Sequence, residues 1–284
     1  MKQIFKVYLF VVLTSLAVSC SSSSDSDGDS IPANSGSLSV NGTSVTLSNN
    51  LAQRSENTLA ITADAEDGSS LQFTFNSFGN LDSANYYDAE GNSYYSYKHF
   101  NSNYFTFNLL SIDAANKTVK VSYSGKVYRE NEDLNSSFKT ISGSFNLTYI
   151  EQTPIVTGLG LSCNIAGNNW YETSFWDNGF FGDLDRKFIS SDANMIAMKF
   201  ASEGITPGTY NFTPTSANAI QLAKYNTTTL EYDFYNCTGT FTVTSNGAVS
   251  FATIVQGTFN FTATNPSNPS QQIVVSNGIF KTNI

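Results

Sequence analysis

The feature that most constrains the fold is a series of short runs rich in β-branched and aromatic residues, separated by clusters of glycine, asparagine, aspartate and serine. Within Leu71–Phe75 and Val119–Tyr123, apolar and polar residues alternate with a period of two, which is typical of a strand with one buried face. No segment of ten or more residues shows convincing helical periodicity, and Thr215–Leu222 is the best candidate for a short helix. The sequence therefore predicts an all-β, antiparallel fold.

The runs that predict strands recur throughout both halves of the chain. In the first half they are Ser37–Val40, Thr58–Ala63, Leu71–Asn76, Tyr104–Leu109, Thr118–Tyr123 and Gly143–Tyr149. In the second half they are Met195–Ala201, Thr209–Phe212, Thr238–Thr244, Val249–Val255, Gly257–Ala263 and Gln272–Phe280.

The two halves resemble a diverged internal repeat. The matched glycines are Gly42 and Gly167, Gly79 and Gly204, Gly125 and Gly257, and Gly143 and Gly278. Their separation grows from 125 to 135 residues, which fits loop insertions between a shared set of strands. Each half is long enough for one β-sandwich or partly closed barrel. We therefore expect two tandem β-sandwich-like or partly closed barrel domains, residues 38–152 and 158–284.

The N-terminus has the order of a bacterial secretory signal. After two lysines, an apolar run covers Val7–Val18, which is shorter than the ~20 residues that span a bilayer. The residues Ala17–Cys20 resemble a lipobox, the recognition site for lipoprotein processing. The resemblance implies that residues 1–19 are a signal peptide that is removed and that Cys20 carries lipid. The alternative is a plain signal peptide cut nearby, which leaves Cys20 as an ordinary thiol.

Residues 20–37 form the next segment, in which Cys20 is followed by SSSSDSDGDSIPANSGS. This stretch is too polar to bury a core, so we expect a flexible acidic tether. Acidic residues just after a lipidated cysteine resemble the export signal of surface-exposed lipoproteins of the Bacteroidota. The expected location is therefore the outer membrane, with the protein facing either the periplasm or the cell surface.

The chain is acidic, with a formal net charge of −9. Removal of residues 1–19 takes away Lys2 and Lys6 and no acid, so the excess of acidic residues grows from 9 to 11. Such a surface repels phosphate backbones, and we expect no nucleic-acid partner. Membrane attachment is expected through the lipid on Cys20 alone. A glycan and another envelope protein both remain open as partners.

Two further cysteines, Cys163 and Cys237, lie in the second half of the chain. In an oxidising compartment they can form a disulfide, which would leave Cys20 to the lipid. The alternative is two separately buried thiols that act as small hydrophobic side chains. The sequence leaves these two alternatives open, because it does not give the distance between the Cα atoms.

Little in the sequence indicates catalysis. The single histidine, His99, lies among tyrosines, without a nucleophile-elbow motif or a second histidine for a metal site, and we expect it to be exposed. No phosphate-binding glycine loop or dinucleotide motif is present, so no catalytic residue, metal or cofactor is predicted. A hydrolase that uses a carboxylate pair, with candidates such as Asp183 and Asp185, is the enzyme alternative.

Aromatic residues gather in two places. Trp176, with several neighbouring rings, asparagines and an aspartate, lies in the second half, and Tyr94, Tyr95 and Tyr97 lie in the first. Flat rings beside amides and carboxylates suit a sugar-binding platform, so these four residues are the candidate ligand contacts. The competing interpretation is that such rings fill the core, and Trp170 is assigned there.

Several short motifs in residues 160–284 resemble an uncharacterised domain common in Bacteroidota lipoproteins. They are I-x-G-x-x-W (Ile165, Gly167, Trp170), P-G-T-Y (Pro207–Tyr210), G-T-F (Gly239–Phe241), G-T-F-x-F (Gly257–Phe261) and G-x-F (Gly278–Phe280). The resemblance implies a β-rich fold and an envelope location, and it brings no activity with it. The leading hypothesis is a non-enzymatic, lipid-anchored envelope or cell-surface protein with a binding or structural role. A glycan-binding accessory lipoprotein is the alternative.

Overall fold

The computed structural model describes residues 34–177, 184–201, 205–249 and 252–283. The predicted signal peptide, Cys20 and most of the predicted tether lie outside these ranges. The described part of the chain is built of strands and one 3₁₀ turn, η1 (Asn101–Asn103), so the predicted all-β fold is confirmed. Among these residues there is no helix with the length and hydrophobicity that crossing a membrane requires.

The first half forms one ten-stranded sheet in the order β2-β1-β10-β3-β4-β5-β6-β7-β9-β8. Its strands are β1 (Ser35–Val40), β2 (Thr43–Val45), β3 (Leu47–Ser55), β4 (Thr58–Ala65), β5 (Ser70–Asn76), β6 (Leu81–Tyr87), β7 (Ser93–Tyr95), β8 (Phe105–Asp113), β9 (Thr118–Tyr128) and β10 (Phe138–Glu151).

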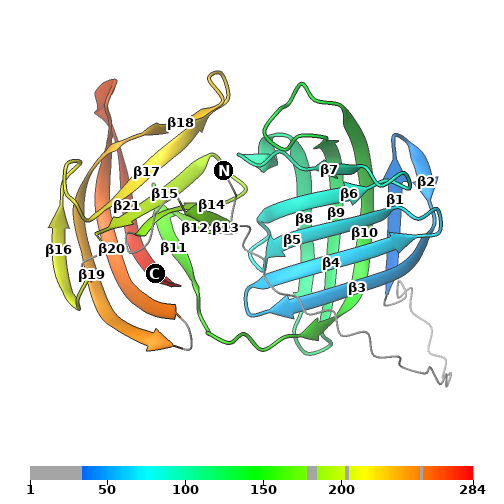
Figure 1. The fold of residues 1–284 in the computed structure, drawn as a ribbon, viewed down its shortest axis with the longest axis horizontal. Coiled ribbons are helices and arrows are strands. Elements are labelled where there is room, and N and C mark those ends of the chain that lie inside the picture. Colours follow the sequence, from blue (N-terminus) through cyan, green and yellow to red (C-terminus); the bar gives the residue numbers. More distant parts are fainter. Residues whose placement is uncertain (1–33, 178–183, 202–204, 250–251, 284) are drawn as a thin grey trace. The chain divides into compact units, whose positions relative to one another are not determined.

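The long strand β10 closes this sheet on itself. It pairs with β9 along most of its length, and its last residues pair in parallel with β3, where Tyr149 lies opposite Ala52. A single pair, Tyr95 opposite Tyr128, joins β7 to β9 and completes the circuit. In Figure 1 the blue-to-cyan strands β3 to β6 cross in front of the green strands β8 to β10. The first half therefore corresponds to the partly closed barrel among the expected folds.

The second half forms two sheets, with six strands in the order β12-β11-β21-β20-β19-β16 and five in the order β13-β14-β15-β17-β18. The strands of the six-stranded sheet are β11 (Gly160–Ile165), β12 (Asn168–Tyr171), β16 (Gly208–Phe212), β19 (Asn236–Val249), β20 (Ala252–Asn265) and β21 (Asn268–Asn283). Those of the five-stranded sheet are β13 (Ser174–Asp177), β14 (Leu184–Ile189), β15 (Asn194–Phe200), β17 (Ala219–Asn226) and β18 (Glu231–Phe234).

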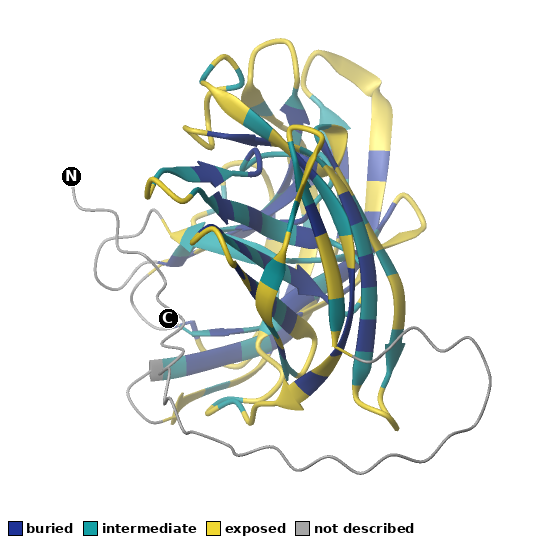
Figure 2. Cartoon of the chain, turned by 90° about the vertical axis from the view of Figure 1, so that its right-hand side faces the viewer, coloured by how far each residue is buried: buried dark blue, intermediate teal, exposed yellow. Residues whose placement is uncertain are grey.

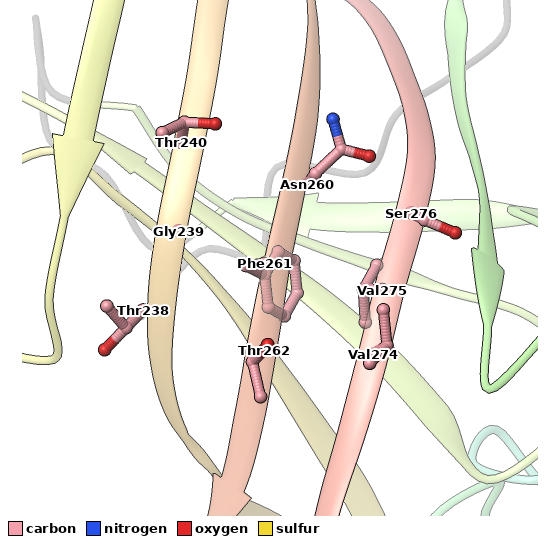
Figure 3. A pocket seen from close by; sticks show the side chains of 9 residues that line it. All are labelled: Thr238, Gly239, Thr240, Asn260, Phe261, Thr262, Val274, Val275 and Ser276. Atoms are coloured by element: carbon pink, nitrogen blue, oxygen red, sulfur yellow. The ribbon is translucent and has the colours of Figure 1, made fainter.

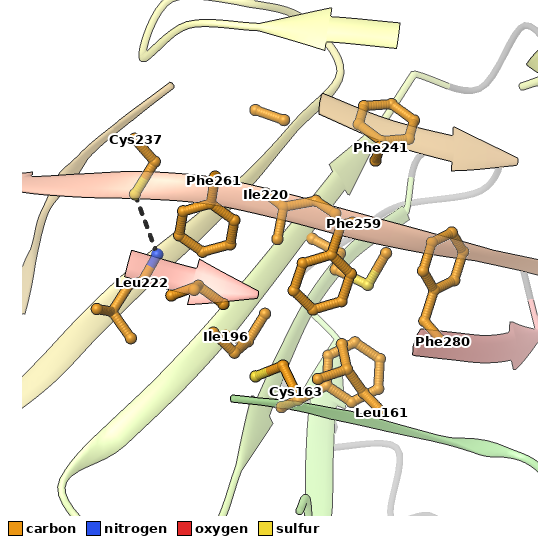
Figure 4. Packing of buried hydrophobic residues seen from close by; sticks show 14 of the residues in the cluster. Leu161, Cys163, Ile196, Ile220, Leu222, Cys237, Phe241, Phe259, Phe261 and Phe280 are labelled. Carbon is orange, nitrogen blue, oxygen red and sulfur yellow. Dashed lines mark hydrogen bonds between the residues drawn. The ribbon is translucent and has the colours of Figure 1, made fainter. Parts of the chain in front are cut away.

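Each half has its own hydrophobic core, and residues 32–284 together make one compact unit. In the second half, Ile196 and Ile220 of the five-stranded sheet pack with Phe259 of the six-stranded sheet, as expected for a sandwich (Figure 4). Figure 2 shows buried and exposed residues alternating along many strands, because successive side chains point to opposite faces. The assignment of Trp170 to the core is confirmed, since it is only 4% exposed.

Glycines in the strands make room for phenylalanines on neighbouring strands. In five cross-strand pairs of the described residues, a glycine lies directly opposite a phenylalanine that a Cβ atom on the glycine would approach closely: Gly36 and Phe145, Gly125 and Phe105, Gly239 and Phe261, Gly257 and Phe280, and Gly278 and Phe259. A Cβ atom at any of these glycines would lie between 2.4 and 2.8 Å from the opposite phenylalanine. The G-x-F and G-T-F motifs are therefore packing motifs, in which a phenylalanine ring from one strand fills the space beside a glycine on the paired strand.

The strand register supports the internal repeat at some points and not at others. Asn41-Gly42 joins β1 to β2, and Ala166-Gly167 joins β11 to β12, with φ of 50° and 83° in the first turn and 51° and 83° in the second. Two positive φ values in a two-residue loop are the signature of a type I′ hairpin. In both halves this hairpin then pairs with the last strand, β10 or β21.

The predicted match of Gly125 with Gly257 is wrong. Gly125 lies opposite a residue two positions before Gly143 on the last strand of its half. Gly257 lies opposite a residue two positions after Gly278. The two glycines thus occupy positions four residues apart relative to the last strand, because a single glycine beside apolar residues is too short a pattern to fix an alignment.

Two predictions of secondary structure are also wrong. The helix expected over Thr215–Leu222 is absent, since β17 begins at Ala219 and lies between β15 and β18. The strand expected over Val249–Val255 spans the junction of two strands, because β19 ends at Val249 and β20 begins at Ala252. Over Thr215–Leu222 the apolar residues lack the two-residue alternation on which the prediction of a strand depends.

An ion pair with a buried arginine ties the paired strands β13 and β14 to the end of β21. Arg186, 3% exposed, makes two charge-assisted hydrogen bonds to Asp177 on the paired strand, at 2.5 and 2.9 Å. Its Nη1 donates to the Thr282 hydroxyl and to Asn283 Oδ1 at the end of β21. The guanidinium carbon lies 3.9 Å from the centre of the Phe175 ring. One side chain thereby links the two sheets of the second half.

Candidate functional site

The four predicted ligand-contact residues do not form one platform. Tyr94 is 9% exposed and belongs to the core of the first half, next to Tyr86. Tyr95 is half-buried in β7, where it pairs with Asn85. Tyr97 is 1% exposed, and Trp176 is half-buried. Because Tyr94 and Tyr97 are buried, their ring faces contact other protein residues. For these two residues the structure therefore agrees with the interpretation that the rings fill the core.

Tyr97 and Trp176 do come together, around His99. The imidazole ring has four aromatic neighbours, with centroids 5.3 to 6.0 Å away: Tyr97, Trp176, Tyr225 and Tyr232. Tyr225 stacks on it, and the other three rings meet it edge-on. The Tyr97 and Tyr225 hydroxyls are hydrogen-bonded to each other. We call these five residues the His99 cluster, and in it the rings pack on one another.

His99 is therefore half-buried, contrary to the expectation of an exposed side chain. Burial, followed by the charge of Lys98, lowers its pKa from 6.5 to about 4, with Glu132 acting in the opposite direction. Lys98 and Glu132 form an ion pair of 2.5 Å beside it. Two buried atoms of the cluster, His99 Nδ1 and the Tyr232 hydroxyl, have no hydrogen-bond partner in the described part of the chain. Burial also raises the pKa of Tyr232.

The lowered pKa of His99 predicts a pH dependence of stability. Between about pH 6.5 and pH 4 the unfolded chain binds a proton that the folded chain does not, so stability falls as the pH falls through this window. The variant His99→Gln should lose this component. Urea unfolding at pH 7 and pH 5 measures it, and an equal loss of stability in the variant and the parent would contradict the assignment to His99.

Cys163 and Cys237 have free thiols and share the core of the second half. The backbone N–H of Leu222 donates to Cys237 Sγ at 3.3 Å (Figure 4). Burial raises the pKa of Cys163 to about 12 and that of Cys237 to about 11, so neither thiol is reactive at neutral pH. Of the two alternatives, the structure has separately buried thiols.

The structure gives little support to the alternative of a hydrolase that uses a carboxylate pair. Asp183 lies outside the described residues, and Asp185 lies on β14 opposite Lys199. In the described ranges there is also no group of three or more histidine, cysteine, aspartate or glutamate residues that could hold a metal ion.

A second feature is the outer face of the six-stranded sheet. Three of the cross-strand rows of outward side chains between β16 and β21 are adjacent to one another: Thr209, Thr242, Thr258 and Ile279; Asn211, Thr240 and Asn260; and Thr238, Thr262 and Val274. None of these side chains carries a charge, although the chain as a whole has a formal net charge of −9. We call this surface the neutral face.

A hollow of about 300 Å³, open to solvent, lies over β19, β20 and β21 on the neutral face (Figure 3). It is lined by Thr238, Gly239, Thr240, Asn260, Phe261, Thr262, Val274, Val275 and Ser276. The register of β20 against β21 shifts beside Asn260, and the N–H of Asn277 (φ 52°) donates to Asn260 Oδ1 at 2.9 Å. This irregularity lies next to the hollow and holds the Asn260 side chain in place.

The hollow and two of the five members of the His99 cluster, Tyr225 and Tyr232, were not predicted from the sequence. Alternating threonines in Thr238–Thr244 were a signal for the neutral face, because they occupy every outward position of this part of β19. Tyr225 and Tyr232 gave no comparable signal, since their meeting with His99 depends on contacts between distant segments.

Comparison with known proteins reaches part of the chain only. Residues 186–282 match the model of a family described as a domain of unknown function (DUF6252). This agrees with the resemblance of the second half to an uncharacterised domain. No curated protein and no solved structure matches the chain.

Proposed function

We propose that the protein is a lipid-anchored, non-enzymatic binding protein of the bacterial envelope that holds its partner on the neutral face. The observation that carries the proposal is this face itself, an open, uncharged surface on an acidic chain. Charged and highly hydrated side chains disfavour close contact, so an uncharged surface is the part of such a molecule best suited to it.

The anchor in this proposal is Cys20, in an outer-membrane lipoprotein of the type found in Bacteroidota. Its support is the order of the N-terminal sequence, from the apolar run through Cys20 to the acidic stretch that follows. A long polar tether would let the folded domains reach a partner away from the lipid surface. Whether that partner is a glycan or an envelope protein depends on the chemistry of the neutral face.

Replacing Cys20 with serine should release the protein from membranes into the soluble fraction, because lipid attachment requires the thiol. Fractionation of cells that express the variant measures this, with Ser21→Ala as the matched control that should remain with the membranes. Continued membrane association of Cys20→Ser would contradict the anchor.

A charge placed on the neutral face tests the binding role. Thr240→Arg puts a cation at an exposed position in the lining of the hollow, and purified envelope polysaccharides and proteins should be retained less by this variant than by the parent chain. Thr74→Arg, a strand position in the first half, is the control. Equal retention by the parent and Thr240→Arg would contradict a binding role for this face.

A further inference from the structure

We propose that the hollow on the neutral face binds an uncharged saccharide. The inference rests on the proposed function and names the ligand class. Four side-chain hydroxyls line the hollow, from Thr238, Thr240, Thr262 and Ser276, and none of them has a hydrogen-bond partner elsewhere in the described ranges. A hydroxyl both donates and accepts hydrogen bonds, so this lining is complementary to a ligand that is itself rich in hydroxyls.

Asn260 adds a directed donor to this set. Its Oδ1 is engaged by the Asn277 N–H, which leaves the Nδ2 amide as the group that it can offer to a ligand. Val274, 58% exposed, and the threonine methyl groups supply apolar surface beside these polar groups. Saccharides present the same mixture, with C–H groups on the ring faces and hydroxyls at the edges.

Charge selects among saccharides. The lining contains no ionisable side chain, and the rest of the chain is acidic, so a carboxylated or sulfated glycan meets repulsion without a compensating cation. A phosphate group is disfavoured for the same reason. A neutral sugar loses no charge hydration when it enters the hollow.

The shape of the hollow sets the expected strength. A site open on one side covers only part of a sugar unit, so the affinity for one unit should be weak, with a Kd on the order of millimolar. A polymer offers many copies of the unit to proteins held close together on a membrane, which raises the effective affinity. The ligand is therefore expected to be a polysaccharide.

The test is affinity electrophoresis of the full chain through gels that contain neutral glucan, mannan or galactan, with polygalacturonate as the anionic comparison. At least one neutral polymer should retard the chain, and polygalacturonate should not. The double variant Thr240→Val/Thr262→Val keeps the β-branched shape but removes two hydroxyls, and it should weaken retardation at least tenfold. Thr258→Val, on the same face but outside the lining of the hollow, should behave like the parent.

As a control, the urea unfolding midpoint of each variant is measured, so that only folded proteins are compared. Absence of retardation by every neutral polymer would overturn the inference, and so would equal retardation of the parent and the double variant. Either result leaves the anchored binding role to be judged separately, by the fractionation of Cys20→Ser and by the retention of envelope proteins on the parent and Thr240→Arg.

Discussion

Replacing Gly257 with alanine should lower the free energy of unfolding by about 3 kcal/mol or more, at the upper end of the usual cost of overpacking. A Cβ atom at this position would lie 2.0 Å from the Thr242 carbonyl oxygen and 2.8 Å from the Phe280 ring. The first of these contacts is with backbone, so relief requires movement of β19 against β20. Urea unfolding measures the change as a shift of the midpoint.

The matched control is Gly247→Ala. Gly247 lies on β19, and a Cβ atom there would meet nothing within 4 Å. Its effect should stay within about 0.5 kcal/mol. Similar losses for Gly257→Ala and Gly247→Ala would contradict the packing role of Gly257.

A related comparison separates ring contacts from backbone contacts. A Cβ atom at Gly278 would meet only the Phe259 ring among its three nearest neighbours, at 2.4 to 2.5 Å. Because a ring can be made smaller, Phe259→Leu should reduce the cost of Gly278→Ala in a double-mutant cycle. No substitution of Phe280 should rescue Gly257→Ala to the same extent, since the Thr242 carbonyl stays in place.

Removal of the Asp177 carboxylate is the second large effect. In Asp177→Ala the Arg186 guanidinium stays buried without a counter-charge, and the expected loss is about 3–5 kcal/mol. The reverse variant, Arg186→Met, leaves behind a carboxylate whose side chain is 44% exposed and can be hydrated. Its main cost is the lost partner of the buried Thr282 hydroxyl, about 1–3 kcal/mol.

The asymmetry between the two variants is therefore the result to measure. Urea unfolding should give a larger loss for Asp177→Ala than for Arg186→Met. Asp185→Ala, which removes a half-exposed carboxylate from the neighbouring strand, should cost under about 1 kcal/mol. A smaller loss for Asp177→Ala than for Arg186→Met would show that the buried charge is stabilised by its other partners.

The sequence predicts a strand well where one face of the strand is buried and the other is exposed to solvent. β5 and β9 alternate in this way along most of their length, and both lie where the alternation places them. β15 and β17 are different, because consecutive residues are buried in both. One face packs in the sandwich core, and residues such as Met195 and Ala223 on the other face pack beside Trp176 and Tyr232. A strand covered on both sides loses its alternation, which is why β17 was predicted as a helix.

The candidate site was harder to predict from the sequence than the fold. Aromatic composition drew attention to Trp176 and Tyr97, but composition does not tell a ring that faces solvent from one that faces another ring. The neutral face depends on which strands become neighbours: Thr240 and Asn260 are opposite each other only because β19 pairs with β20. The pairing and its register are relations between two strands, which the composition of either strand alone does not give.

The glycine–phenylalanine pairs also bear on how the long hairpin β20–β21 finds its register. A slip of two residues keeps every side chain on its proper face, so alternation alone does not oppose it. In this hairpin such a slip either sets Gly257 against Gly278, with an empty space between them, or sets Phe259 against Phe280, with two rings competing for one place. Each glycine–phenylalanine pair therefore opposes a slip in either direction. A strand whose outward residues are mostly interchangeable threonines is held to a single alignment by these inward pairs.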